Sequence, residues 1–252
     1  MITNVQKRWA SRAMVSAAIL VCMCLGFTKK RTYQPAAIPA VVGTTVANAV
    51  KGGGAGKVAL YEKLGLQAMG LSREAFTYAL SGFSNLLNAG KIQKDNILSI
   101  LDFSLPSNKK RLFVIDLESE EVLYNTFSSH GKNSGKIIPT DFSNQENSNK
   151  SSLGFYVTRE TYNGKHGCSL RLEGEEEGFN SNALSRGIVM HSAAYVNETV
   201  AARQGFIGRS QGCPAVPEAV SKSIINTIKN GSCLFIYSPD KNYIAKSKMI
   251  QA

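Results

Sequence analysis

Past Pro106 the chain becomes a series of short apolar segments separated by polar, glycine-rich turns, which limits it to a fold built from short strands. The expected strands are 111–117, 122–127, 154–161, 168–172, 187–191 and 233–237. The acidic turn 118–121 joins the first two as a hairpin. One late helix is expected over 217–230, with a proline in its first turn and an apolar face at helical spacing. This part of the chain is therefore expected to be mainly β.

The stretch before Pro106 has a helical period instead. Ser72 is a suitable N-cap, and large apolar residues recur at helical spacing until Gly90. A second, short helix is expected over 94–101. We expect residues 57–104 to form a short helical lead-in that packs against the β domain and spaces it from what precedes.

The first residues of the chain have the charge pattern of an export signal. An apolar run, 13–27, lies between basic residues. At about fifteen residues it is short for a membrane span of about twenty and suits the apolar core of a signal peptide. Because basic residues also follow at 29–31, both a signal peptide and a retained N-terminal membrane anchor stay open for residues 1–31. Lipidation at Cys22 is disfavoured because the residues before it are not small. Proline and glycine make 32–56 a linker.

The net charge limits the classes of binding partner, and the cysteine count indicates whether the thiols are free or paired in disulfides. A net charge of +11 favours a solvated surface or an anionic lipid or envelope polymer. No nucleic-acid partner is expected, because the basic residues are spread singly without an Arg-rich arm. Three cysteines follow the linker, and an odd number in an exported protein indicates at least one free thiol. A bridge between Cys168 and Cys233 stays open.

Cys213 has the surroundings of a nucleophile. It lies in the turn Ser210-Gln211-Gly212-Cys213-Pro214, and His191 ends an apolar run upstream. An adjacent imidazole can remove the proton of a thiol and later protonate a leaving amine. The loop between the two residues has to fold back, and the amides of Gly212 and Cys213 are suited to bind an oxyanion. From these residues alone, a buried structural cysteine near a coincidental histidine is the alternative.

Several motifs together resemble the murein L,D-transpeptidase catalytic domain family. Met190-His191-Ser192-Ala193, followed by the serine–any–glycine–cysteine turn, is similar to its active-site signature. Further blocks in order are His130-Gly131-Lys132-Asn133-Ser134-Gly135, Phe142-Ser143-Asn144, Ser151-Ser152-Leu153-Gly154-Phe155, Tyr162-Asn163-Gly164-Lys165-His166-Gly167 and Gly178-Phe179-Asn180. The resemblance extends over roughly 105–240 and leaves 241–252 as a C-terminal tail. It implies a β-sandwich-like catalytic domain preceded by the short helical region.

The resemblance also implies a reaction on peptidoglycan stem peptides. Cys213 attacks the carbonyl at the L-centre of a diamino acid, D-alanine leaves, and an amine of a second stem resolves the acyl-enzyme into a 3→3 cross-link. His191 is the implied general base and acid, and Ser210 is expected to orient the loop. This chemistry needs no metal or organic cofactor, and no two histidines have the spacing of a helical metal site.

Two roles stay open within this resemblance. The family usually has an arginine two residues after the cysteine, where this chain has Ala215. The candidates for binding the substrate carboxylate in its place are Arg209, Arg203 and Arg186. The group that orients His191 is either a backbone carbonyl or Ser192.

The two remaining histidines lie in polar, glycine-rich turns. His130 is a candidate to line the substrate cleft, and His166 is a weaker one. A turn residue with no catalytic part is the alternative for both.

Two rival functions share these residues. If water resolves the acyl-enzyme, the activity is that of an L,D-carboxypeptidase or endopeptidase. A non-catalytic module that binds the cell envelope through its basic surface is the rival from another class. A papain-like protease is disfavoured, because in that family the cysteine precedes the histidine.

Overall fold

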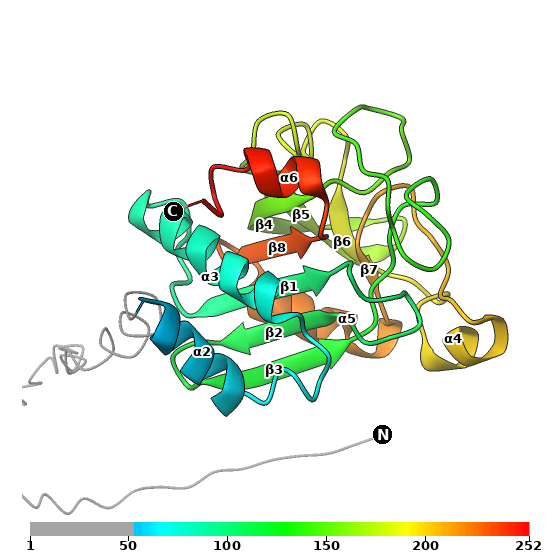
Figure 1. Cartoon of the computed structure of the whole chain (residues 1–252). Helices are drawn as coiled ribbons and strands as arrows, with labels where there is room; N and C mark the ends of the chain where they lie inside the picture. The colour runs from blue at the N-terminus through cyan, green and yellow to red at the C-terminus, as the bar shows by residue number, and fades with distance from the viewer. Residues whose placement is uncertain (1–52, 252) are drawn as a thin grey trace, which may run out of the picture. The chain divides into compact units, whose positions relative to one another are not determined.

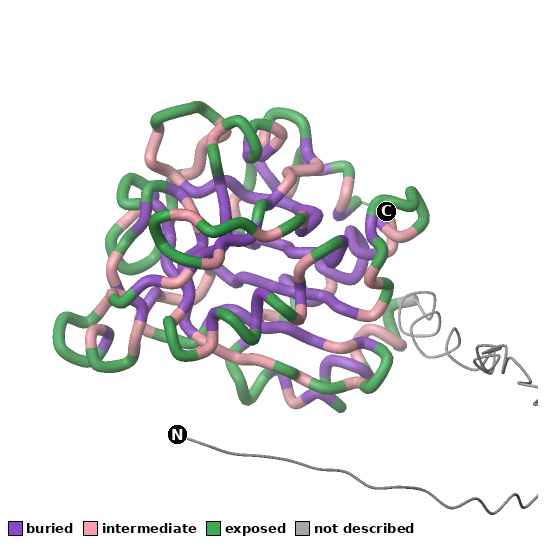
Figure 2. The backbone as a smooth tube through the Cα atoms, turned by 180° about the vertical axis from the view of Figure 1, so that it is seen from behind, coloured by how far each residue is buried: buried purple, intermediate pink, exposed green. Residues whose placement is uncertain are grey.

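In the computed structural model, which describes residues 53–251, eight strands form one mixed sheet in the order β3-β2-β1-β8-β4-β5-β6-β7 (Figure 1). The strands are β1 Ile97–Asp102, β2 Leu112–Asp116, β3 Glu121–Thr126, β4 Gly154–Gly164, β5 Gly167–Gly174, β6 Val189–Ser192, β7 Ala215–Val216 and β8 Cys233–Tyr237. Figure 2 shows the middle of the sheet buried and the loops around it exposed. A mainly β domain with helices before it was expected, and this fold class is confirmed.

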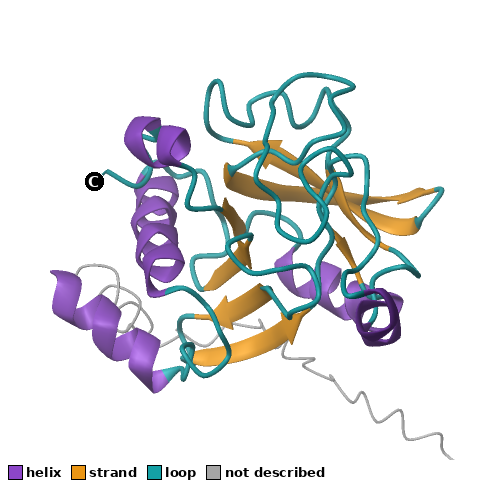
Figure 3. Cartoon of the chain, turned by 45° about the vertical axis from the view of Figure 1, so that its right-hand side comes forward, coloured by secondary structure: helices purple, strands orange, loops and turns teal. Residues whose placement is uncertain are grey.

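Helices lie on both faces of the sheet. The helices of the described part of the chain are α2 Gly53–Lys63, α3 Arg73–Asn88, α4 Glu198–Gln204, α5 Glu218–Ile228 and α6 Lys241–Lys246. In Figure 1, α3 crosses the front of the sheet over β1 and β8, and α5 lies behind it. Figure 3 shows the long loops gathered on the side away from α2 and α3. The functional residues predicted from sequence lie mostly in those loops and at the strand ends beside them.

The start and packing of α3 follow from its sequence. The Ser72 hydroxyl accepts a hydrogen bond from the Ala75 amide at 3.2 Å, as an N-cap does. Gly82 faces the sheet, and a side chain there would place its first carbon 2.1 Å from the Phe155 ring. Glycine at this position therefore lets α3 lie close against β4.

The short helix expected over 94–101 is wrong, because Ile97–Asp102 is β1. All six residues of β1 are buried, which explains why the segment is mostly apolar. β1 pairs antiparallel with β2 and parallel with β8, whose residues come more than a hundred positions later. A short apolar run does not distinguish a fully buried strand from a helix, and here the distant pairing decides.

Both ends of the described region contain helices where the sequence analysis expected a linker and a C-terminal tail. α2 begins at Gly53, inside the segment expected as a linker. The expected tail includes α6, and Tyr243 of α6 donates a hydrogen bond to the buried Glu176 at 2.8 Å. The signal peptide or anchor expected over 1–31 lies outside the described residues. Within 53–251, no helix has both the length and the apolar character to span a membrane.

Candidate active site

The pairing of β6 with β7 brings His191 close to the turn that carries Cys213. The two strands run parallel, and His191 lies opposite Ala215. Ala215 follows Cys213 by two residues, so the turn ends beside the last residues of β6. The segment between them, which includes α4, folds back as the sequence predicts.

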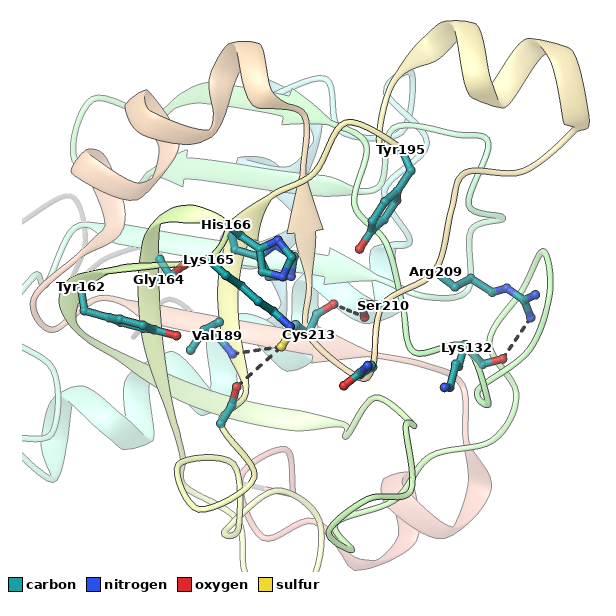
Figure 4. A pocket seen from close by; sticks show the side chains of 14 residues that line it. Lys132, Tyr162, Gly164, Lys165, His166, Val189, Tyr195, Arg209, Ser210 and Cys213 are labelled. Atoms are coloured by element: carbon teal, nitrogen blue, oxygen red, sulfur yellow. Dashed lines mark hydrogen bonds between the residues drawn. The ribbon is translucent and has the colours of Figure 1, made fainter.

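Cys213 and His191 line the same cavity, which has a volume of about 440 Å³ (Figure 4). The cavity is lined by Lys132, Tyr162, Gly164, Lys165, His166, Ser169, Gly187, Val189, His191, Tyr195, Arg209, Ser210, Gln211 and Cys213. Of the site residues predicted from sequence, Ser210 and Arg209 are therefore also at this cavity. Gly212, Ser192 and His130 are not among its lining residues.

The Cys213 thiol is half-buried in this cavity. Its sulfur accepts a hydrogen bond from the Val189 amide at 3.5 Å and lies 3.7 Å from the Gly187 carbonyl oxygen. Burial raises the pKa of the thiol above its usual value near 9, against the opposing effects of the Val189 amide and of the charges on Arg186 and Lys165. The thiol is therefore protonated at neutral pH and needs a base before it attacks.

The His191 imidazole is held in one tautomer. Its Nδ1 lies 2.8 Å from the Ser192 carbonyl oxygen, which can only accept, so Nδ1 carries the proton. Burial lowers the pKa of His191 below its usual 6.5, and the nearby charges of His166 and Lys165 act in the same direction. At neutral pH His191 is therefore neutral, and its Nε2 is free to accept a proton. The orienting group is a backbone carbonyl, one of the two alternatives left open by the sequence.

No hydrogen bond joins the imidazole to the thiol among the described residues; the Cys213 sulfur instead contacts Val189 and Gly187. Catalytic hydrogen bonds are often long in the absence of substrate and tighten when it binds.

Ser210 fixes the shape of the turn. Its hydroxyl accepts a hydrogen bond from the Gly212 amide at 3.1 Å and donates one to the Cys213 carbonyl at 2.6 Å. Gly212 has φ +125°, and a side chain there would meet the Lys150 carbonyl oxygen at 2.8 Å. The turn is thus specified by a serine that bridges it and by a glycine that no other residue replaces without strain.

A family model of the L,D-transpeptidase catalytic domain matches residues 67–237, which are 171 of the 252 residues. The chain belongs to this family. The resemblance stated from the motifs is thereby confirmed. Family membership assigns residues 67–237 to an L,D-transpeptidase catalytic domain.

The solved structures that resemble this chain are only distantly similar to it. The L,D-transpeptidase from Mycobacterium smegmatis is 15% identical with a TM-score of 0.36, and the match covers 57% of this chain and 59% of that one. An L,D-transpeptidase from Mycobacterium tuberculosis H37Rv is 11% identical, with a TM-score of 0.36 and coverage of 57% and 58%. The cell shape determining protein Pgp2 of Campylobacter jejuni is 14% identical, with a TM-score of 0.38 and coverage of 68% and 58%. The chain thus spans about three fifths of these proteins. No curated protein sequence matches it, so the family model alone carries the assignment.

The three candidate arginines have different surroundings. Arg186 donates hydrogen bonds to two carbonyls and two hydroxyls, on Ser143, Lys150, Ser152 and Ser148. Arg209 lines the cavity, but its Nη1 donates to the carbonyls of Lys132 and Gly135 at 3.0 and 3.2 Å. Arg203 is exposed on α4 and does not line the cavity. Arg186 is thus held by its protein partners and Arg203 is away from the cavity, whereas Arg209 is at the cavity with its Nη1 engaged.

His130 lies inside the protein beside Arg111. Arg111 Nη2 donates to His130 Nδ1 at 2.8 Å, so the imidazole proton is on Nε2, which donates to the Gly135 carbonyl at 3.1 Å. Burial and the Arg111 charge lower the pKa of His130 to about 4. The His130 carbonyl accepts from the Ser210 amide at 2.9 Å. His130 therefore supports the turn from behind and does not face the cavity.

We expect Arg111→Met to lower the free energy of unfolding by about 3–5 kcal/mol, the usual effect of breaking a buried charged network. Arg111 is fully buried and also donates to the Ser128 and Leu105 carbonyls, so the variant leaves several buried acceptors unpaired. Urea unfolding measures the loss. Arg203→Met, on the surface, is the control and should change stability by about 0.5 kcal/mol or less. A loss below about 1 kcal/mol for Arg111→Met would contradict this account.

The tip of the β4–β5 hairpin contributes residues that the sequence did not rank highly. The His166 ring stacks on the His191 ring, with centroids 4.4 Å apart and planes 22° apart. The Ser192 hydroxyl donates to the His166 carbonyl at 3.1 Å. Lys165 and Tyr162 of the same hairpin also line the cavity. The block 162–167 in the family resemblance and the weaker candidacy of His166 were the signals that pointed to this segment.

The three cysteines of the described part of the chain are all free, so the bridge between Cys168 and Cys233 is not formed. Burial raises the pKa of Cys233 strongly, and this thiol is inside the core. Within 53–251, no three histidine, cysteine or acidic side chains are grouped in a way that would hold a metal ion.

Proposed function

We propose that this chain is an exported cysteine acyltransferase that forms an acyl-enzyme on Cys213 from peptidoglycan stem peptides and releases D-alanine. One observation carries the proposal: the Cys213 thiol and the His191 imidazole line a single cavity, and His191 Nδ1 is bonded to the Ser192 carbonyl, which leaves Nε2 to act as the base. Cations line this cavity and acidic residues do not, which suits a peptide that bears several carboxylates. We place the enzyme in the periplasm or cell envelope, either free or retained through residues 1–31.

Acylation follows from the protonation states of the pair. His191 Nε2 takes the thiol proton as Cys213 Sγ bonds to the carbonyl carbon at the L-centre of the diamino acid. The Cys213 amide is the proposed donor to the oxyanion, since the Gly212 amide already donates to Ser210 Oγ. The carbon–nitrogen bond then breaks, D-alanine leaves as the amine with the proton from His191, and a thioester remains.

Transfer reverses these steps with a second stem. His191 removes a proton from the side-chain amine of the acceptor, which attacks the thioester carbonyl. The new amide forms a 3→3 cross-link, and the thiol leaves with the proton held by His191. The sum is an exchange of one amide for another.

The test is intact-protein mass spectrometry of the full chain after incubation with tetrapeptide stems. The expected result is a mass gain of the acyl group on Cys213 with release of D-alanine. Adding a second stem as acceptor should then give a cross-linked dimer. Release of tripeptide without dimer, in the presence of acceptor, would assign the chain to the hydrolases. No adduct and no turnover by folded protein would reject the acyltransferase.

We expect a broad pH profile for kcat/KM. Activity should rise with pH as His191 loses its proton, at a pKa below 6.5, and should fall as Cys213 loses its proton, at a pKa above 9. The acidic and alkaline limbs of the profile report the titration of His191 and Cys213 as a coupled pair. Iodoacetamide labelling of Cys213 should accelerate only toward pH 9 and above. Rapid labelling already near pH 5 would indicate a thiolate–imidazolium pair and contradict the burial argument.

A further inference from the structure

The cavity beside Cys213 has an uneven charge. Three of its lining side chains are cationic, Lys132, Lys165 and Arg209, and none is acidic. All three residues are exposed at the cavity, and a cation without an acidic partner binds an anion there when its donors are free. The question is which of the three is free.

Hydrogen bonding separates the three cations. Arg209 already donates to the carbonyls of Lys132 and Gly135. The ammonium groups of Lys165 and Lys132 have no hydrogen-bond or ion-pair partner among the described residues, in contrast to Lys150, which pairs with Asp141 at 2.6 Å. Both lysines are therefore available to a ligand.

Position separates the two lysines. Figure 4 shows Lys165 reaching from the hairpin tip toward Cys213, whereas Lys132 lies beside Arg209 on another wall of the cavity. The charge of Lys165 also lowers the pKa values of both Cys213 and His191. Lys165 is thus the free cation next to the reacting groups.

The segment that carries Lys165 is attached to the catalytic strand. The neighbouring His166 stacks on His191, and its carbonyl accepts the Ser192 hydroxyl at 3.1 Å. These contacts hold the hairpin tip over the end of β6. They give the Lys165 backbone a fixed place relative to the imidazole.

We propose that Lys165 binds the free carboxylate of the C-terminal residue of the acyl donor and so selects donors that end one residue after the scissile carbonyl. The inference rests on the proposed function. In such a donor the carboxylate carbon is three bonds from the carbonyl carbon that Cys213 attacks, so an anion site next to the thiol receives it. A longer donor carries its carboxylate past Lys165, and an amidated donor has none.

Two alkylating reagents test the anion site without any acyl donor. Iodoacetate and iodoacetamide displace iodide by the same attack of Cys213 and differ in charge. We expect Lys165→Met to lower the iodoacetate-to-iodoacetamide rate ratio at Cys213 by about threefold to tenfold at low salt, measured on the full chain by peptide mass spectrometry. A change in the thiol pKa slows both reagents equally and cancels in the ratio. Lys165→Arg should retain the ratio.

Lys132→Met is the matched control, because it removes the same charge from another wall of the same cavity. We expect it to change the ratio by less than about twofold. An unchanged ratio in Lys165→Met, or an equal fall in Lys132→Met, would overturn the assignment of the anion site to Lys165.

The donor itself supplies the second measurement. With a tetrapeptide donor that has a free C-terminal carboxylate, wild type should form the acyl-enzyme at least about tenfold faster than with the C-terminal amide of the same peptide. Lys165→Met should lose this preference, because its rate falls with the carboxylate donor and not with the amide donor. Equal preference in wild type and Lys165→Met would overturn the inference. If wild type forms no acyl-enzyme with either donor, the proposed function fails, and the alkylation ratio still decides whether Lys165 forms an anion site.

Discussion

Replacing Cys213 with alanine is expected to lower the rate of D-alanine release by about 10⁴-fold or more, since the variant has no nucleophile to form the acyl-enzyme. The nearest hydroxyl on the turn does not replace it. Ser210 Oγ donates to the Cys213 carbonyl and accepts from the Gly212 amide, so its proton is already used within the turn. Single-turnover acylation, followed by mass spectrometry, measures the loss.

Cys168→Ala is the matched control for this prediction. Cys168 is also half-buried and free, but it is opposite Asn163 in the hairpin and does not line the cavity. We expect its acylation rate to stay within about twofold of wild type, as for substitutions away from the reacting groups. Full activity of Cys213→Ala would place the nucleophile elsewhere. If that variant also binds sacculi and restores every phenotype, the chain is a binding module.

Local sequence patterns predicted the elements that local forces specify. The Ser72 cap and the apolar spacing after it gave α3, and alternating or short apolar runs between glycine-rich turns gave β2, β3 and β8. The failure at 94–101 has a different origin. β1 is buried on both faces between β2 and β8, so neither periodicity nor a polar face distinguishes it from a helix.

The site shows the same division. The turn of Cys213 and the histidine at the end of a strand were predicted, because each is a short motif with its chemistry in one segment. The stacking of His166 on His191 and the place of Lys165 were not, because they depend on how the β4–β5 hairpin lies over β6. His130 was considered for the cleft, yet its partner Arg111 is nineteen positions away and draws it inside. Polar composition of a turn does not reveal such a partner.

Replacing His191 with alanine is expected to lower kcat/KM by about 10²–10⁴-fold, the range for losing a positioned general acid–base group. The buried thiol stays protonated at neutral pH, and its sulfur contacts only a backbone amide and a backbone carbonyl, which do not accept its proton. The loss should therefore shrink at strongly alkaline pH, where hydroxide ionises the thiol. The measurement is the pH dependence of acyl-enzyme formation.

The variant His166→Ala tests whether His166 acts as a base itself or only through its stacking on His191. Because His166 charge and burial both lower the pKa of His191, removing the ring should move the acidic limb of the profile upward, toward 6.5, with a loss in plateau rate below about tenfold. A His191→Ala variant that keeps a rate within tenfold of wild type, or a His166→Ala variant that loses as much as His191→Ala, would assign the base differently. The expected pattern leaves Nε2 of His191 as the one group that accepts the Cys213 proton, with His166 acting only through the imidazole on which it stacks.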